Sequence, residues 1–334
     1  MFPDSLLELL GCSESLKDNA LDYLLWLVPG LLFLYMECVG MMLIRLDGSP
    51  KFAMLVQIVA AVVNIGLDWY MIFPLEWGVM GAALATSIAC ASGGMMVLVY
   101  FSWFHDKLRF YRLKMSVTSM FLTLRNTGYM TKIGFATFLT ELAMGVMMMT
   151  GNYMFIRYLG ENGVAAYAVA CYLFPLVFSI SNAVAQSAQP IISFNHGLHD
   201  GGRVNRTLRI SLFTAIVCGI VVTLCLWLGA PWVTEMFLSP DEAAYNLAAN
   251  GLPLFSTCAM FFAVNIAFIG YYQSIERAGV SMAYTLLRGI VFLVPCFLLL
   301  PRLMGDSGLW LAIPAAELLT CIVICTRYAV RNRR

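Results

Sequence analysis

The sequence predicts an all-α polytopic membrane protein with nine transmembrane helices. Of its 334 residues, 61% are hydrophobic and only 12% are charged, whereas a soluble domain is about 25% charged. Apolar segments of about 20 residues, the length that crosses a bilayer, recur along the chain. Basic residues gather in alternate connections between these segments. The net charge of +1 gives no reason to expect a nucleic-acid partner.

The first three predicted spans cover residues 22–44, 52–75 and 78–103. A charged turn with a glycine, LDGSP at 46–50, joins the first to the second. The third span contains GAALATSIACASGG at 81–94, a run of small residues that favours close helix packing. These three spans form one group at the start of the chain.

Six further spans follow, and proline marks the second of them. Pro175 and Pro190 are expected to kink or end that helix, because proline lacks the backbone N–H that a helix needs. The ten cysteines of the chain fall mostly inside apolar runs, where they act as small hydrophobic residues. The six predicted spans cover 131–156, 162–190, 208–232, 246–272, 280–301 and 307–327.

The distribution of basic residues predicts the orientation of these spans. If the tail RYAVRNRR is cytoplasmic, the connections 45–51, 104–130, 191–207 and 273–279 are cytoplasmic as well. Those regions and the adjoining helix ends hold every Lys and Arg except Lys17, Arg157, Arg302 and Arg288. This is the positive-inside pattern. We therefore expect a multi-pass membrane protein with its C-terminus in the cytoplasm.

The connection 104–130 is the longest of the predicted inside segments and divides the chain. We expect residues 1–103 to be a three-helix part of an N-terminal lobe, and residues 131–334 to be a six-helix C-terminal lobe with a basic tail. The segment between them is a cytoplasmic basic linker. It is either an amphipathic segment on the membrane surface or a solvated basic loop.

Two parts of the chain repeat each other weakly. IRLDGSPKFAMLVQIV (44–59) is similar to IERAGVSMAYTLLRGIV (275–291), and EWGVMGAALATSIAC (76–90) is similar to DSGLWLAIPAAELLTC (306–321). Duplicated halves are typical of transporters. The copies are unequal, since six spans make up the second and three the first. We therefore expect an incomplete version of a two-lobe, twelve-helix duplicated transporter, with three N-terminal helices, on the order of 100 residues, missing.

Four motifs in order resemble the multidrug and toxic compound extrusion (MATE) family. They align with helices four to twelve of that twelve-helix family and are closer to its bacterial and archaeal members, which implies a location in a bacterial or archaeal inner membrane. The resemblance implies two six-helix lobes around a central cavity, and efflux of organic, often cationic, compounds driven by inward flow of Na⁺ or H⁺. The motifs are LIRLDGSPKFAM with NIGLD (43–68), WGVMGAALAT (77–86), GFATFLTE (134–141) and SNAVAQSAQPIISFNHG (181–197).

Glu141 is the first candidate for the coupling site. It stands about ten residues into an apolar run, where a carboxylate costs roughly 2.5–3.5 kcal/mol and usually has a partner or a function. The family's acidic residue on the first helix of its second lobe matches Glu141. Asn152, eleven residues further along, lies within roughly 30° of the same helix face. A second acid, which some members of the family carry on their tenth helix, has no counterpart here, because the matching segment 252–273 holds no acid, only Asn265 and Gln273.

Polar side chains elsewhere in the spans are further candidates. Asn182, Gln186 and Gln189 share one helix face and either line a cavity or bond neighbouring helices. Glu37 is a candidate for the first lobe's side of a cavity. Arg288 is expected to neutralise one of the membrane acids, with Glu317 among the possible partners.

The favoured function is a cation-coupled antiporter for organic, cationic compounds in the plasma membrane, with no cofactor and no bound metal apart from the coupling Na⁺ or H⁺. There are two alternatives. One is a related flippase of lipid-linked or anionic molecules, and the other is a truncated remnant or accessory half that transports nothing.

An enzyme is not expected, because no nucleophile–base or metal-ligand spacing is present. The H-x-x-H of NHGLHD (195–200) lies in a predicted loop and favours a turn. Expected partners are a small organic substrate and membrane lipid; the oligomeric state is not predicted.

Overall fold

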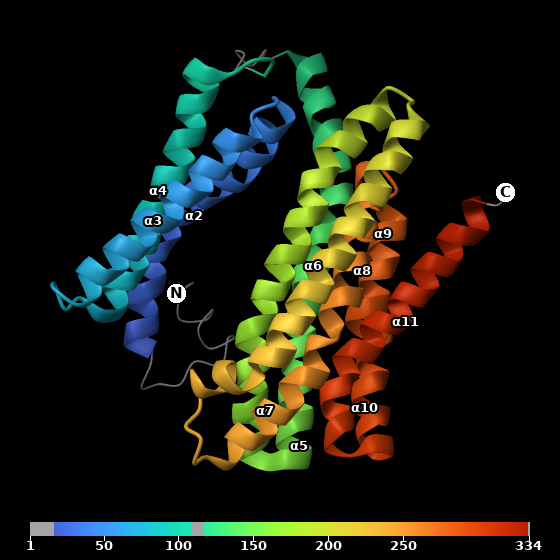
Figure 1. The fold of residues 1–334 in the computed structure, drawn as a ribbon. Helices are drawn as coiled ribbons and strands as arrows, with labels where there is room; N and C mark the ends of the chain where they lie inside the picture. The colour runs from blue at the N-terminus through green and yellow to red at the C-terminus, as the bar shows by residue number, and fades with distance from the viewer. Residues whose placement is uncertain (1–16, 109–115, 333–334) are drawn as a thin grey trace. The chain divides into compact units, whose positions relative to one another are not determined.

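The computed structural model describes residues 17–108 and 116–332, and every regular element in them is helical (Figure 1). The chain divides into two units, Met1–Lys114 and Met115–Arg334. This boundary falls inside the segment predicted as a linker, of which residues 109–115 lie outside the described part. The linker stays a prediction.

The helices are α2 (Lys17–Leu46), α3 (Pro50–Ile72), α4 (Gly78–Val99), α5 (Val117–Gly197), α6 (Gly201–Glu235), α7 (Ala243–Ser256), α8 (Cys258–Ser274), α9 (Ala278–Leu286), α10 (Leu293–Met304) and α11 (Asp306–Asn332), with π-helical turns η2 (Tyr100–Phe104) and η3 (Leu287–Val291).

Seven helices in the described residues are long and apolar enough to cross a membrane, and α7 with α8 makes an eighth if that bent pair is one span. At about 1.5 Å per residue, the 81 residues of α5 would extend for about 120 Å, four times the hydrocarbon core of a bilayer. A break at Gly160 (φ 65°, ψ −155°) divides α5 into two arms that fold back on each other in Figure 1. The predicted count of nine requires both arms to be counted and stays a prediction.

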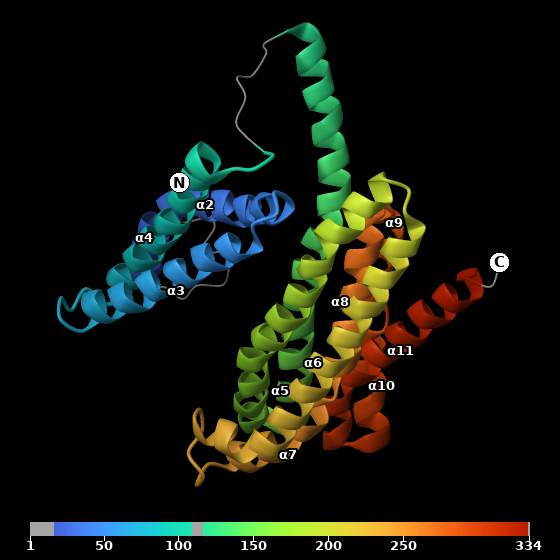
Figure 2. The ribbon, with the colours of Figure 1, turned by 45° about the horizontal axis from the view of Figure 1, so that its top comes forward.

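Some predicted helix boundaries are wrong, because capping interactions and not hydropathy end these helices. α5 begins at Val117 instead of 131, and its exposed first turns extend beyond the ends of α6 and α9 (Figure 2). Pro190 does not end the helix, which continues to Gly197. The Asp200 side chain then caps α6 by accepting a hydrogen bond from the backbone N–H of Arg203 at 3.0 Å. The predicted connection 191–207 therefore shrinks to three residues.

In the unit Met1–Lys114, glycines bring α2 and α4 into close contact. A Cβ atom at Gly30 would lie 2.6 Å from Cα of Ser87, and one at Gly40 would lie 2.2 Å from Cγ1 of Val97. Neither position has room for a side chain. The small-residue face predicted for 81–94 is therefore used for close packing, as in other membrane bundles.

Asp47 fixes the turn between α2 and α3 to the segment that follows α4. Its buried carboxylate accepts backbone N–H groups from Asp106 at 2.8 Å and from Lys107 and Leu108 at 2.7 Å each. The hydroxyl of Tyr100 donates a fourth hydrogen bond at 2.8 Å. Burial alone would raise the pKa of Asp47, but these four donors lower the pKa to about 2. The charged carboxylate thus stabilises the end of η2.

We expect Asp47→Asn to destabilise the protein by about 2–3 kcal/mol, because an amide has one acceptor oxygen for four donors. Thermal unfolding of the purified chain in detergent measures the loss. The folded pKa lies below the ordinary value of 3.8, so the contribution is complete above pH 3.8 and is lost as the pH falls towards 2. Asp106→Asn is the matched control, since the side chain of Asp106 is exposed. Equal effects of the two variants would contradict this role.

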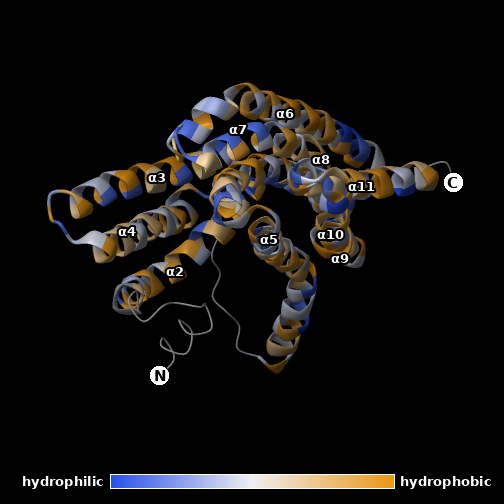
Figure 3. Cartoon of the chain, turned by 90° about the horizontal axis from the view of Figure 1, so that it is seen from below, coloured by the Kyte–Doolittle hydropathy of each residue, from blue (hydrophilic) through white to orange (hydrophobic). Residues whose placement is uncertain are grey.

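The unit Met115–Arg334 has an aromatic core between the arms of α5 and the last helix. The rings of Phe155 and Tyr167 stack at 4.5 Å across the α5 hairpin, and Trp310 of α11 meets Phe155 edge-on at 5.0 Å. Hydrophobic residues run along every labelled helix (Figure 3), as expected of surfaces that meet lipid. The protein is a multi-pass membrane protein.

Candidate functional site

A buried ion pair stands inside the unit Met115–Arg334. Nε of Arg288 lies 3.0 Å from Oε1 of Glu317, and the two residues are only 5% and 4% exposed. The Arg288 guanidinium also lies 4.4 Å above the ring of Phe262, which is a cation–π distance. The only arginine predicted inside a span is thus neutralised by the acid of the last helix.

Asn265 of α8 completes this group. Its Nδ2 donates to Oε2 of Glu317 at 2.8 Å and to the backbone carbonyl of the same residue at 2.9 Å. Asn265 is fully buried. We call Arg288, Glu317 and Asn265 the charge cluster. It joins η3, α11 and α8, so three separate segments of the chain must pack correctly before it forms.

The first arm of α5 packs directly against η3. A Cβ atom at Gly289 would lie 2.2 Å from Cβ of Ala143, so only glycine allows this approach. The hydroxyls of Thr140 and Thr285 meet at 3.4 Å in a buried contact. Arg288 lies on a π-helical turn, a distortion that is frequent at functional sites. These contacts hold the first arm of α5 against α9 and η3 on either side of Glu141.

Glu141 therefore lies at the edge of the charge cluster. Its side chain is exposed, and Thr140 and Ala143 of the same helical turn pack against Thr285 and Gly289, which flank Arg288. Arg288 thus forms its ion pair with buried Glu317, and the accessible Glu141 lies on the helix that packs against the same turn. An accessible carboxylate beside a buried cation is an arrangement in which a bound cation or proton changes the local charge balance.

Some polar atoms of the cluster have no hydrogen-bond partner among the described residues. They are Nη1 of Arg288 and Oδ1 of Asn265, with the nearby hydroxyl of Tyr284 in the same state. An unsatisfied buried polar group costs about 1–3 kcal/mol. Arg288 consequently keeps one donor nitrogen available while its Nε is engaged.

A chain of side-chain hydrogen bonds lies near Glu141. Nε2 of Gln189 donates to Oε1 of Gln273 at 3.1 Å, and Nε2 of Gln273 donates to Thr137 Oγ1 at 3.4 Å. Thr137 stands one helical turn before Glu141. Of the two uses predicted for the amide face, Gln189 makes the bond between helices. Asn182 and Gln186 are half-buried on the same arm.

Two further predicted site residues do not belong to the charge cluster. Asn152 is exposed on the first arm of α5, and no contact in the described residues ties it to Arg288 or Glu317. Glu37 belongs to the other unit, where it is 4% exposed and packs against Gly93, whose Cβ would lie 2.5 Å from the carboxylate. The roles predicted for these two residues stay predictions.

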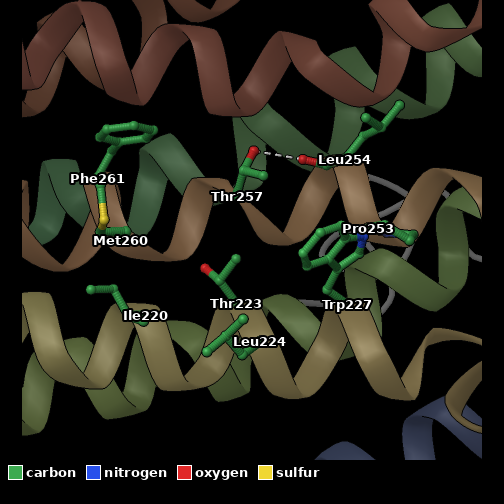
Figure 4. A pocket seen from close by; sticks show the side chains of 9 residues that line it. All are labelled: Ile220, Thr223, Leu224, Trp227, Pro253, Leu254, Thr257, Met260 and Phe261. Carbon is green, nitrogen blue, oxygen red and sulfur yellow. Dashed lines mark hydrogen bonds between the residues drawn. The ribbon is translucent and has the colours of Figure 1, made fainter.

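An apolar cavity of about 400 Å³ lies where α7 meets α8, at the break around Thr257 (Figure 4). Thr223 donates to the carbonyl of Ser256 at 2.9 Å, and Thr257 donates to that of Leu254 at 2.7 Å. Both hydroxyls are therefore occupied. Trp227, Met260 and Phe261 line the rest. This cavity suits apolar groups and not charged ones.

The break at Thr257 also corrects a predicted span. Residues 246–272 do not form one straight helix but belong to the pair α7–α8, which is bent by 40°.

Two partners in this site are not predicted from the sequence. Asn265 and Gln273 stand there only in the place of an acid, whereas in the structure Asn265 binds Glu317 and Gln273 bridges Gln189 and Thr137. Their amide side chains inside an apolar run were the available signal. The pairing of Arg288 with Glu317 needed the three-dimensional packing.

Comparisons with known proteins agree with this fold. A family model described as MatE matches residues 1–70 and 136–298. The multidrug export protein MepA of Staphylococcus saprophyticus is 24% identical over 290 residues, 86% of this chain and 62% of that protein. MepA of Staphylococcus haemolyticus is 25% identical over 334 residues, 99% of this chain and 72% of that protein. The chain thus spans 62–72% of the length of these relatives.

Solved structures show the same fold. An outward-facing multidrug resistance MATE family transporter of the MOP superfamily superimposes with a TM-score of 0.88 at 21% identity, covering 99% of this chain and 74% of that one. A MOP superfamily transporter from Pyrococcus furiosus gives a TM-score of 0.87 at 21% identity, covering 98% and 73%.

Proposed function

The chain belongs to the MatE family, and from that premise we propose that it is a cation-coupled antiporter that exports organic, mainly cationic, compounds by alternating access. Its family relatives include proteins named multidrug export proteins, which supports drugs or metabolites as substrates. We place it in a bacterial or archaeal inner membrane with the C-terminus in the cytoplasm. The observation that carries the proposal is the accessible Glu141 beside the buried charge cluster.

The charges of this site add up to a switch. Arg288 and Glu317 cancel each other within the ion pair, so the carboxylate of Glu141 leaves one negative charge. Binding of one proton or one Na⁺ at Glu141 makes the whole group neutral. In a low dielectric a lone charge is costly, so the two states of Glu141 favour different surroundings. The neutral state holds the coupling ion, and the charged state attracts a cationic substrate.

The ion pair also bears on the kind of substrate. A flippase for anionic or lipid-linked molecules needs positive charge in its cavity, whereas the guanidinium of Arg288 is engaged by Glu317. Glu141, which lies beside the charge cluster, has an exposed side chain. Both features favour an organic cation. The paired amides of Gln189 and Gln273 offer neutral hydrogen-bonding groups nearby, with Asn182, Gln186 and Asn152 as further candidates to line the substrate path.

We also propose roles for the remaining candidates. Glu37 would face the substrate path from the N-terminal lobe, and the segment 104–130 would be the linker on the cytoplasmic side. The two lobes would rock against each other about a site near the middle of the membrane, as is general for transporters built from repeats. No cofactor takes part beside the coupling ion.

The experiment uses the purified chain in liposomes loaded with a fluorescent organic cation. We expect release of the cation when an inward H⁺ or Na⁺ gradient is imposed, and the gradient that drives it identifies the coupling ion. Protein-free liposomes and liposomes with a collapsed gradient are the controls. Release that needs neither gradient would overturn coupling. A chain that inserts but releases nothing would favour the alternative, a remnant or accessory half that does not transport.

A further inference from the structure

A second cavity, with polar residues in its lining, lies at one end of the unit Met115–Arg334, away from the charge cluster. It has a volume of about 290 Å³ and forms where α5 passes into α6 and where α8 passes into α9. Its lining includes His196 of the last turn of α5 and His199 of the following loop. Asn205 of α6, Tyr271 of α8 and Arg277, at the start of α9, also line it.

Among the described residues, no carboxylate lines this cavity. Arg277 carries a permanent positive charge, and the other ionisable lining residues are the two histidines and Tyr271. Arg209 stands one helical turn beyond Asn205 on the same face of α6. Guanidinium and imidazolium groups donate charge-assisted hydrogen bonds to phosphate oxygens, and an asparagine amide adds neutral donors.

The acids near this cavity are engaged elsewhere or do not line it. Asp200 caps α6 through Oδ1, while its Oδ2 lies 3.5 Å from the Arg203 side chain. Glu276 precedes Arg277 and is exposed; it does not line the cavity. The balance at the cavity itself is therefore positive.

We propose that this cavity, which we call the basic pocket, binds a phosphate group. A volume of about 290 Å³ equals the space of about ten water molecules at about 30 Å³ each, enough for a phosphate and its ester oxygen. Both connections that form it, 191–207 and 273–279, are predicted to be cytoplasmic. The inner leaflet there carries anionic phospholipids. The phosphate comes either from such a headgroup or from a soluble phosphate.

The backbone offers a mild way to test this site. His199 has φ +57°, a conformation that glycine adopts without strain. His199→Gly therefore removes the imidazole without disturbing the loop. Arg277→Gln removes the charge but keeps a long polar side chain. Arg302→Gln is the matched control, because Arg302 lies in the last turn of α10 and does not line the basic pocket.

The test uses the full chain and two probes. Titration of detergent-solubilised protein with phosphatidylglycerol, against phosphatidylcholine, is followed by native mass spectrometry; inorganic phosphate is titrated in parallel with thermal unfolding as the readout. We expect one probe to bind the wild-type chain. We further expect each of Arg277→Gln and His199→Gly to weaken that binding about fivefold, while Arg302→Gln leaves it unchanged.

The outcomes separate the sources of the phosphate. Preference for phosphatidylglycerol without an effect of inorganic phosphate identifies a lipid headgroup, and the reverse identifies a soluble ligand. Binding of neither probe overturns the proposal. So does binding that Arg302→Gln weakens as much as Arg277→Gln, because the attraction is then a general property of surface charge. None of these outcomes depends on transport activity.

Discussion

Glu141→Gln is expected to reduce gradient-driven efflux by about 5- to 150-fold, the range that coupling free energies between two sites usually span. Glutamine has the shape of a protonated glutamate, so the variant is held permanently in the neutral state of the switch. Because the side chain is exposed, the folded protein loses little stability. Efflux of a fluorescent cation from liposomes with and without the imposed gradient measures the effect.

The matched control for this prediction is Glu161→Gln. Glu161 is an exposed acid on the same helix α5, just after the break at Gly160, and it takes no part in the charge cluster. Its variant should transport like the wild type. Undiminished gradient-dependent efflux by Glu141→Gln would show that coupling takes place elsewhere, although the antiport itself would stand.

Glu317→Gln is expected to destabilise the protein by about 3–5 kcal/mol. This substitution leaves the guanidinium of Arg288, which is 5% exposed, as an uncompensated buried charge, and breaking a buried pair from one side costs that much. Thermal unfolding in detergent detects it as a large drop in melting temperature. Glu235→Gln, an exposed acid on α6, is the control and should have almost no effect.

The double variant Arg288→Met with Glu317→Gln should restore most of that stability. Both charges are removed together, and the amide oxygen introduced at position 317 still accepts the hydrogen bond from Asn265. Replacing both members of a buried pair is often neutral. The restored protein then separates structure from function: if it keeps gradient-dependent efflux, Arg288 is structural, and if it is stable but uncoupled, Arg288 acts on Glu141. A single Glu317→Gln as mild as its control would contradict the buried pair.

The sequence by itself determined the membrane class and the approximate place of the spans. In lipid each helix must satisfy its own backbone hydrogen bonds within about 20 apolar residues, so this information is local and can be read from hydropathy. The four motifs likewise predicted the family, because each lies within a short run of the chain. Glu141 stood out for the same reason, since a carboxylate among apolar neighbours is visible without any structure.

Only the tertiary structure decided which of these residues meet. Arg288 had several acids as possible partners, and the packing of η3 on α11 selected Glu317, 29 residues away, while α8 brought Asn265 to the same carboxylate from 52 residues away. Asp47 likewise reaches donors about 60 residues later in the chain. Hydropathy measures how each segment partitions into lipid, but a contact between two segments depends on their rotation and depth. Those are fixed by close approaches such as Gly289 on Ala143, which no single segment encodes.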